Sequence, residues 1–352
     1  MIVRHENQDR SSGPRGRFDG KPTGQCCCSA VGSDRMGSVT DQECHINRGR
    51  DMMADTQKLL VTPQQVADGL AAGTLLDGNG EAEGGRLRVI DCTVRFETHP
   101  VGASTIHSGR DQWLQGHIPG AAYLHMVDDL SDPAGAYPFA LAPQSQIDSR
   151  LSAIGIEPDD TVVLYGAGTP VAVTRAWWVL RVSGLADVRI MDGGWAAWQA
   201  GGHPVATGEE TFTPSTFRGA RQADAVADRD AVRRAMQTGE AQLLNALSRE
   251  QFAGTGGTHY GRPGRIPASI SCPANDILDP VTGQFATIDE MRRAFAAIDP
   301  DRPVITYCGG GIAAAAALFG LHRIGHRDLS LYDSSLLEWS TVPDLPMETD
   351  GD

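Results

Sequence analysis

The chemistry that this sequence suggests centres on Cys308. Residues 304–307 are apolar or β-branched and predict a buried strand, and an alanine-rich stretch further on predicts a helix. The loop that joins them comprises Gly309, Gly310, Gly311, Ile312 and Ala313. Its glycines let the backbone curl around the sulfur, and the amides of the loop and of the new helix can then point at it. Such a cradle favours the thiolate, which is the nucleophilic form of cysteine.

The same pattern has an ordinary structural alternative. Many cysteines at strand ends are small buried hydrophobic residues, and a glycine-rich turn after a strand is common in α/β proteins. The choice between a reactive and a structural Cys308 therefore depends on the rest of the chain.

Short apolar segments alternate with helical segments on both sides of this loop. Residues 87–92 and 161–166 predict buried strands, and residues 173–183 predict a helix. Thr62 starts an earlier helix, because Pro follows it at the first helical position and Gln65 can complete a capping box. This alternation predicts an α/β fold with a mainly parallel central sheet flanked by helices.

The plan of alternating segments occurs twice. LRVIDC, GHIPGA, VLYGAGT and VRIMDGGWAAW recur in the same order as LLNALS, GRIPAS, ITYCGGG and LSLYDSSLLEW. Four motifs repeated at an offset of about 140 to 155 residues indicate a duplicated domain. In this alignment Cys308 falls opposite Gly166, so only the second copy can perform thiol chemistry.

The repeat sets the expected domain boundaries. We expect a disordered tail over residues 1–57, a catalytically inactive first domain over 58–205, a linker over 206–216 and a catalytic domain over 217–352. The tail is rich in Gly, Ser, Arg, Asp and Gln. It holds Cys26, Cys27, Cys28, Cys44 and His45. Their spacing fits no regular zinc pattern, so no metal site is predicted.

Composition narrows the possible partners and location. The chain of 352 residues carries 44 acidic and 30 basic residues, for a net charge of −14, which disfavours nucleic acid and anionic membranes as partners. A small anionic substrate would then need a local positive pocket. No segment resembles a membrane-spanning helix or a signal peptide, and the seven cysteines form no disulfide framework. We expect a cytoplasmic, monomeric protein without a cofactor.

Taken together, the repeated motifs resemble the tandem-domain rhodanese family, the thiosulfate and 3-mercaptopyruvate sulfurtransferases. The resemblance is carried by IDC, GHIPGA, DGGWAAW, RIPAS, YCGGGIAA and YDSSLLEW. It implies two rhodanese-like domains, of which the first is inactive, with a catalytic cleft at their interface. It also implies that the Cys308 thiolate takes a sulfane sulfur from a donor, forms a persulfide, and passes the sulfur to cyanide or a thiol.

The sequence departs from the family where the donor binds. Relatives that prefer mercaptopyruvate often have serine in place of Gly310, proposed to act with the histidine equivalent to His117. Relatives also place arginine where Gln251 stands. The candidates that remain to bind an anionic donor are His259, Arg262, Arg265 and His117. Each has a structural alternative, as a solvated loop residue or, for His117, as part of the core.

Three functions follow from this comparison. Gly310 and Gln251 favour thiosulfate as the donor, and the alternatives are a 3-mercaptopyruvate sulfurtransferase and a non-enzymatic persulfide carrier or redox-sensing module. A cysteine phosphatase would need arginine six residues after the cysteine, where this chain has Ala314. The sequence therefore predicts a sulfurtransferase with a small anionic donor and a thiol or cyanide acceptor.

Overall fold

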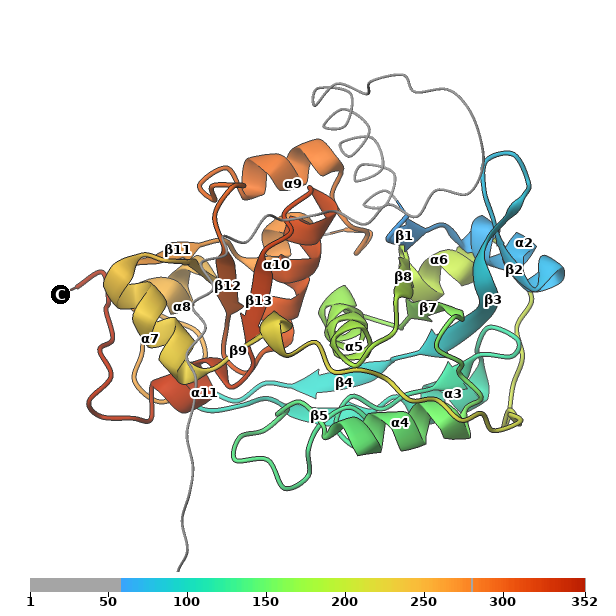
Figure 1. The fold of residues 1–352 in the computed structure, drawn as a ribbon, viewed down its shortest axis with the longest axis horizontal. Coiled ribbons are helices and arrows are strands. Elements are labelled where there is room, and N and C mark those ends of the chain that lie inside the picture. The colour runs from blue at the N-terminus through green and yellow to red at the C-terminus, as the bar shows by residue number, and fades with distance from the viewer. Residues whose placement is uncertain (1–57, 280, 352) are drawn as a thin grey trace, which may run out of the picture. The chain divides into compact units, whose positions relative to one another are not determined.

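A computed structural model describes residues 58–279 and 281–351, which form two α/β domains in sequence (Figure 1). The predicted tail, with its four cysteines and His45, lies outside the described residues. None of the helices in the described ranges has both the length and the apolarity to cross a membrane.

The first domain is built on a six-stranded sheet. Its strands follow the order β1 (Leu60–Val61), β8 (Asp187–Met191), β7 (Thr161–Tyr165), β3 (Ala82–Asp91) and β2 (Thr74–Leu76), and β6 (Ala122–Tyr123) also pairs with β3. All of these pairings are parallel except that of β2 with β3. The helices of this domain are α2 (Pro63–Ala72), α3 (Arg110–Gln115), α4 (Gln144–Ala153), α5 (Pro170–Val182) and α6 (Gly194–Ala200).

The second domain has a five-stranded sheet in which every pairing is parallel. The order is β11 (Ser269–Ser271), β10 (Gln242–Asn245), β12 (Val304–Tyr307), β13 (Leu329–Tyr332) and β9 (Val226–Ala227). Its helices are α7 (Arg229–Thr238), α8 (Arg249–Ala253), α9 (Ile288–Ala294), α10 (Ile312–Arg323) and α11 (Ser335–Trp339), with short 3₁₀ turns at Ala223–Ala225 and Ala274–Ile277.

The two sheets share one strand order, which confirms the predicted duplication and the mainly parallel α/β fold. Strand β12 in the second sheet takes the place of β7 in the first. The carbonyl of Gly166 accepts a bond from the Trp195 amide, and the carbonyl of Cys308 accepts one from the Leu336 amide. Cys308 and Gly166 therefore occupy equivalent positions, as the aligned motifs predicted.

Local sequence rules account for the helix starts that position these strands. Thr62 caps α2 through the Gln65 amide and the Gln65 side chain returns a bond to the Thr62 amide, which completes the predicted capping box. The same reciprocal pair joins Thr287 and Glu290 at the start of α9. Both boxes satisfy backbone donors that would otherwise lack a partner.

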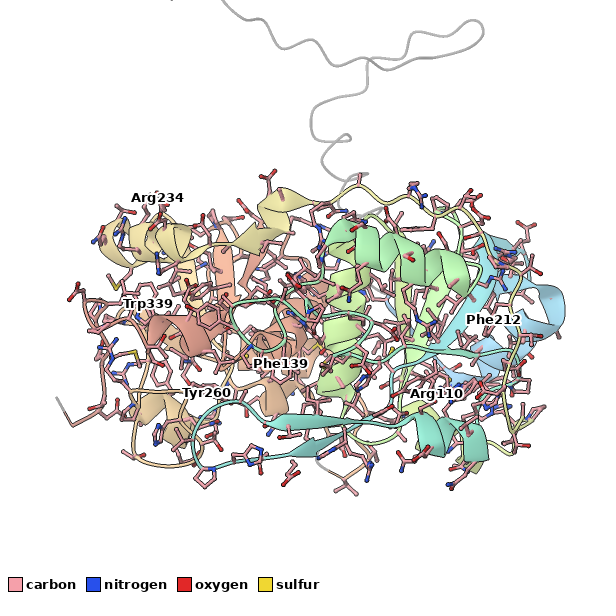
Figure 2. The ribbon with its side chains drawn as sticks, turned by 90° about the horizontal axis from the view of Figure 1, so that it is seen from below. Arg110, Phe139, Phe212, Arg234, Tyr260 and Trp339 are labelled. Carbon is pink, nitrogen blue, oxygen red and sulfur yellow. The ribbon has the colours of Figure 1, made fainter. Side chains whose placement is uncertain are left out.

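A two-stranded ribbon adds to the first domain an element that the sequence did not predict. Strands β4 (Val94–Glu97) and β5 (Thr105–Ser108) pair antiparallel, and Figures 1 and 2 show the ribbon extending towards the second domain. At its tip the Thr258 hydroxyl donates to the His99 carbonyl (2.7 Å) and the Gly102 amide donates to the His259 carbonyl (2.8 Å). The ribbon thus ties the first domain to a loop of the second.

The two domains share one hydrophobic core. Buried side chains from both sheets belong to a single packed cluster, in which helices α5 and α10 lie against each other. The Trp177 ring meets the Phe319 ring edge to face, with centroids 5.0 Å apart. The Asp192 carboxylate also accepts a bond from the Phe285 amide across the interface (3.0 Å).

Candidate functional site

Cys308 lies directly after the central strand β12, at the carboxyl edge of the second sheet. Ligands in open parallel sheets bind at this edge. The side chain is 2% exposed. Its own amide donates to the Ser335 hydroxyl (3.0 Å), and Leu336 and Leu337 donate their amides to the carbonyls of Cys308 and Gly309. The start of α11 therefore fixes the backbone on both sides of the sulfur.

The glycine loop leaves its amide donors available. Within residues 58–279 and 281–351, none of the amides from Gly309 to Ala313 donates to another protein group. Gly311 (φ 79°) caps α10 in the left-handed region, and the unpaired amides of its first turn carry the positive end of the helix dipole. This loop can therefore stabilise negative charge on a sulfur, although the Cys308 amide itself is used by Ser335.

Close packing explains the first two glycines of the loop. A Cβ atom at Gly309 would clash with the Tyr260 ring, and one at Gly310 would lie 2.7 Å from a methyl group of Leu337. Tyr260 comes from the loop over residues 254–264, so two distant segments close around the cysteine. Burial, and secondarily the charge of the nearby Cys308, raise the pKa of Tyr260 to about 12.

The first domain contributes two residues to this loop. The Phe139 ring lies 3.4 Å from the position of a Cβ at Gly310, and Figure 2 labels it with Tyr260. The buried Arg175 guanidinium donates to the carbonyls of Phe139 (2.7 Å) and Gly311 (3.4 Å). It also pairs with the Asp333 carboxylate at 2.7 Å and lies over the Trp178 ring. The cysteine loop is therefore built at the interface of the two domains.

Backbone strain concentrates around the same loop. Among the described residues, three that are not glycine have positive φ: Phe139 (66°), Ala268 (61°) and Ser335 (50°). Phe139 and Ser335 both contact the cysteine loop. Strain of this kind persists only where the surrounding structure enforces it, and it is often found at functional sites.

A pocket of about 250 Å³ lies beside Tyr260. It is lined by Leu247, Gln251, Gly254, Thr255, Gly256, Gly257, Thr258, His259, Tyr260, Arg262, Pro263, Gly264 and Leu336. Leu336 bonds to the Cys308 carbonyl and Tyr260 packs on Gly309, so the pocket adjoins the cysteine loop. Two predicted donor-binding residues, His259 and Arg262, belong to this lining.

Arg262 brings a positive charge to the pocket. Its guanidinium donates to the backbone carbonyls of Ser340 (2.9 Å) and Val342 (2.8 Å), and within the part of the chain that the structure describes it forms no ion pair. His259 is partly buried, as Arg262 is, and its Nδ1 lies 2.7 Å from the Gly261 carbonyl. The pocket is therefore the most suitable place near Cys308 for an anion.

The other two predicted donor-binding residues, Arg265 and His117, lie in equivalent positions of the two domains and make structural contacts. Arg265 pairs with Glu348 and with Asp350 (2.6 Å), so its charge is neutralised. His117 is fully buried, stacks on Trp113 with ring centroids 4.4 Å apart, and contacts the Trp113 carbonyl through Nδ1. In the described residues neither side chain contacts the cysteine loop, so their binding roles stay predictions.

The sequence did not indicate several residues that the fold brings to the cysteine. They are Tyr260, Ser335, Phe139 and Arg175. Ser335 had a detectable signal, because it replaces Gly194 of the first copy at a position where both backbones are left-handed. The other three come from loops or a helix whose contacts depend on the tertiary fold.

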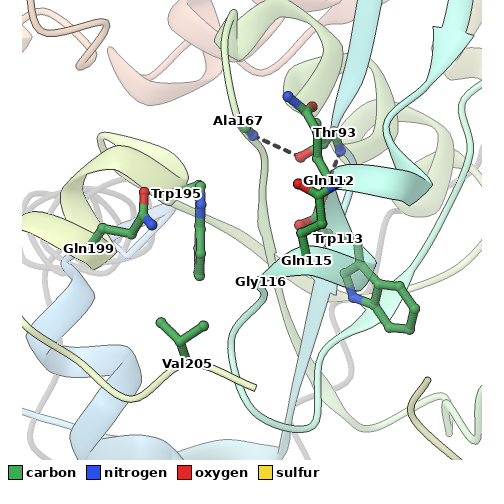
Figure 3. Close-up of a pocket in the computed structure, with 10 residues that line it drawn as sticks. Thr93, Gln112, Trp113, Gln115, Gly116, Ala167, Trp195, Gln199 and Val205 are labelled. Atoms are coloured by element: carbon green, nitrogen blue, oxygen red, sulfur yellow. Dashed lines mark hydrogen bonds between the residues drawn. The ribbon is translucent and has the colours of Figure 1, made fainter. Parts of the chain in front are cut away.

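Figure 3 shows the equivalent place in the first domain. This pocket of about 290 Å³ is lined by Asp91, Thr93, Gln112, Trp113, Gln115, Gly116, Ala167, Trp195, Gln199 and Val205. The Ala167 amide, which corresponds to the Gly309 amide, donates to the Thr93 hydroxyl at 2.8 Å. Burial raises the pKa of the Asp91 carboxyl. The loop after β7 thus has no thiol at the position of Cys308, where Gly166 stands, and it lacks one of the open amides.

The remaining described cysteines are poorly suited to nucleophilic chemistry. Burial raises the pKa of Cys92 well above its usual value, and it raises the pKa of Cys272 to about 11. Both thiols are therefore protonated near neutral pH. In the described ranges no group of three or more His, Cys, Asp or Glu residues is arranged to hold a metal ion.

Comparison with known proteins agrees with this fold and site. Residues 74–201 and 228–341 match the family described as Rhodanese-like domain, and together they make up more than half of the chain. The protein belongs to the rhodanese family, with two copies of its domain in tandem.

Individual relatives refine the comparison. Thiosulfate/3-mercaptopyruvate sulfurtransferase 1, mitochondrial, of Arabidopsis thaliana is 31% identical over 263 residues, which cover 68% of this chain and 69% of the relative. A probable 3-mercaptopyruvate sulfurtransferase of Pseudomonas aeruginosa is 31% identical over 299 residues, covering 82% and 98%. The crystal structure of SseA from Escherichia coli, described as a 3-mercaptopyruvate sulfotransferase, is 25% identical with a TM-score of 0.65, covering 79% of this chain and 98% of that one.

Proposed function

We propose that this protein is a sulfurtransferase whose nucleophile is Cys308. The observation that carries the proposal is the position of Cys308 shortly before the start of α10. The five amides that follow it, those of residues 309–313, have no protein partner in the described chain. Such donors stabilise a thiolate and equally the terminal sulfur of a persulfide. The activities named for the Arabidopsis and Pseudomonas relatives support the same reaction class.

The reaction proceeds in two transfers. The Cys308 thiolate attacks the outer sulfur of thiosulfate, a new S–S bond forms, and the bond to the inner sulfur breaks so that sulfite leaves with the electron pair. Cyanide or a thiolate then attacks the outer sulfur of the persulfide, which yields thiocyanate or a new persulfide. The Cys308 thiolate leaves with the electron pair and is ready for the next cycle.

Thiosulfate is the donor that we favour. Arg262, which pairs with no carboxylate among the described residues, supplies a positive charge to the pocket next to the loop, which suits a small dianion. Gly310 has no hydroxyl to assist mercaptopyruvate, and a Cβ atom there would lie 2.7 Å from a methyl group of Leu337. 3-Mercaptopyruvate is the alternative donor, because the names of the relatives include it.

The remaining parts of the proposal concern the whole chain. We place the inactive domain at residues 58–205, the linker at 206–216 and the catalytic domain at 217–352. The bond from Ala167 to Thr93 and the absence of a thiol at Gly166 support inactivity of the first domain. We also propose a cytoplasmic, monomeric enzyme, which the cysteine usage and composition support.

The proposal is tested with Cys308→Ser and a comparison of donors. We expect Cys308→Ser to lower turnover of thiosulfate and cyanide to thiocyanate at least about 1,000-fold, with an unchanged circular dichroism spectrum. Intact mass after thiosulfate treatment should show one added sulfur in the parent and none in the variant. Cys272→Ser is the matched control and should retain activity.

Three outcomes would contradict parts of this proposal. Substantial turnover by Cys308→Ser would exclude the assigned nucleophile. A kcat/KM for 3-mercaptopyruvate above that for thiosulfate would reverse the donor ranking. Persulfide formation without multiple turnovers would indicate a carrier instead of an enzyme.

A further inference from the structure

Tyr260 separates Cys308 from the pocket that adjoins it. Its ring packs directly on Gly309, the residue after the cysteine, and the same side chain lines the pocket of about 250 Å³. Neither Cys308 nor any of the loop residues 309–313 is part of that lining. The thiol is 2% exposed. A molecule in the pocket therefore meets Tyr260 before it meets the sulfur.

The segment that carries Tyr260 is held on both sides. The Ser340 hydroxyl donates to the Tyr260 carbonyl (2.8 Å), and the Gln251 carboxamide donates to the Thr258 carbonyl (2.7 Å). The Thr258 hydroxyl in turn bonds to the His99 carbonyl at the tip of the β4–β5 ribbon. The backbone of this loop is therefore anchored to both domains, and the ring is the part that can move by side-chain rotation alone.

The proposed chemistry requires such a movement. A nucleophilic sulfur must approach the sulfur that it attacks to roughly 3–3.5 Å along an open line, and the observed cover over Cys308 leaves no such line. The phenol is neutral near pH 7, as an ordinary tyrosine is, and burial raises its pKa further, to about 12, so the ring does not repel an anion on the way in. The ring can therefore discriminate between molecules by their size and not by their charge.

We propose that Tyr260 determines which molecules reach Cys308, admitting small donors and acceptors such as thiosulfate and cyanide and excluding peptide-sized thiols. This inference deepens the proposed sulfurtransferase function, because it assigns the acceptor class. The selective element is the ring that lies on Gly309. Shortening the side chain at residue 260 should therefore widen access, whereas removal of its hydroxyl alone should not.

Chemical labelling tests the cover without any need for sulfur transfer. Tyr260→Ala and Tyr260→Phe are compared with the parent in alkylation by iodoacetamide and by a maleimide carrying a polyethylene glycol chain of roughly 2 kDa. Peptide mass spectrometry reads the label at Cys308 alone. We expect Tyr260→Ala to raise the rate with the bulky maleimide at least 10-fold, with a smaller change for iodoacetamide, and Tyr260→Phe to match the parent.

Acceptor kinetics supply the second readout. The ratio of kcat/KM for glutathione to kcat/KM for cyanide should rise at least 5-fold in Tyr260→Ala and stay unchanged in Tyr260→Phe. Tyr260→Leu, which keeps an apolar contact with Gly309, replaces the alanine variant if that variant fails to fold, and it should show the same direction. Melting temperature and circular dichroism verify each variant.

The outcomes separate this inference from the proposed function. Equal bulky labelling of the parent and the shortened variants would overturn the assignment of Tyr260. If labelling follows the prediction but the parent shows no sulfur transfer, the role of Tyr260 in covering Cys308 stands and the proposed sulfurtransferase function is refuted. A loss of labelling selectivity in Tyr260→Phe would assign the effect to the hydroxyl and overturn the size argument.

Discussion

Ser335 holds the backbone of Cys308 in place through its side chain. Its hydroxyl accepts the Cys308 amide (3.0 Å) and donates to the Tyr332 carbonyl (2.8 Å), while its backbone has φ 50°. The first domain has Gly194 at the equivalent position, where a positive φ is free of strain. In the second domain a strained serine therefore stands at this position and supplies the hydrogen-bond acceptor for the Cys308 amide.

Substitution of Ser335 should separate these two effects. Ser335→Ala leaves the buried Cys308 amide without a partner and keeps the strain, and we expect it to lower the free energy of unfolding by about 1–3 kcal/mol. Ser335→Gly loses the same hydrogen bond but relieves left-handed strain of roughly 1 kcal/mol. Urea denaturation should therefore rank the parent first, glycine second and alanine last. If alanine were at least as stable as glycine, the strain would not be relevant.

At the residue scale the sequence indicated the proposed nucleophile, Cys308, but not most of the residues that the fold brings to it. Cys308 and its glycines are consecutive in the chain, so the local sequence was enough to suggest an anion-binding loop around the sulfur. Tyr260 and Arg175 lie 48 and 133 positions before the cysteine and reach it only through the tertiary fold. Arg265 and His117 were chosen by motif, and the structure gives them buried structural contacts that a motif cannot reveal.

Helix α5 connects the first domain to the cysteine loop through Arg175. The guanidinium is 1% exposed and reaches Asp333 at the end of β13, the carbonyl of Gly311, and Phe139. The second oxygen of Asp333 accepts the Leu141 amide from the first domain (2.6 Å). One buried ion pair therefore joins a helix of one domain to a strand end and a loop of the other.

Loss of this ion pair should be costly. Arg175→Met leaves the Asp333 carboxylate without its cation in a largely buried site, and we expect a loss of roughly 3–5 kcal/mol of unfolding free energy. Arg110→Met is the matched control, because it breaks an exposed ion pair with Glu209 (2.6 Å), where a change below about 1 kcal/mol is expected. Guanidinium denaturation measures both. A small effect at Arg175 would mean that water replaces its contacts.

At the scale of elements, the sequence placed the parallel strands well and missed the antiparallel ribbon. Strands β7 and β12 are fully buried runs of apolar, β-branched and aromatic residues, which is the pattern of strands buried on both faces, and the last residues of β3 and β8 are buried as well. Strands β4 and β5 are short and partly exposed, and the loop between them contains Pro100 and Gly102. Such a ribbon carries little hydrophobic signal of its own.

The shared core packs the two domains together as one unit. Helices α5 and α10 pack together between the sheets, and Trp177, which is 2% exposed, meets Phe319 from the other domain. Apolar surface on either side of this interface would be exposed to water if the domains separated. Each domain therefore stabilises the other through this interface.

This packing predicts one cooperative unfolding transition. Calorimetry on the full chain should give a single peak for the two domains together. Trp177→Ala should move that peak to lower temperature, with a loss of roughly 3–5 kcal/mol, without splitting it. Two resolved transitions in the parent would contradict a shared core, and a split that appears only in the variant would show that Trp177 is what couples the domains.

The ribbon at the tip of the first domain also has a consequence for the order in which the protein is made. The bond between Thr258 and His99 joins residues 159 positions apart, and contacts of such separation form late in folding. Synthesis delivers the first domain before Cys308 exists, so the ribbon is already present when the second domain emerges. The cover over Cys308 is therefore completed only after β12 has been translated, when the Tyr260 loop docks on the ribbon.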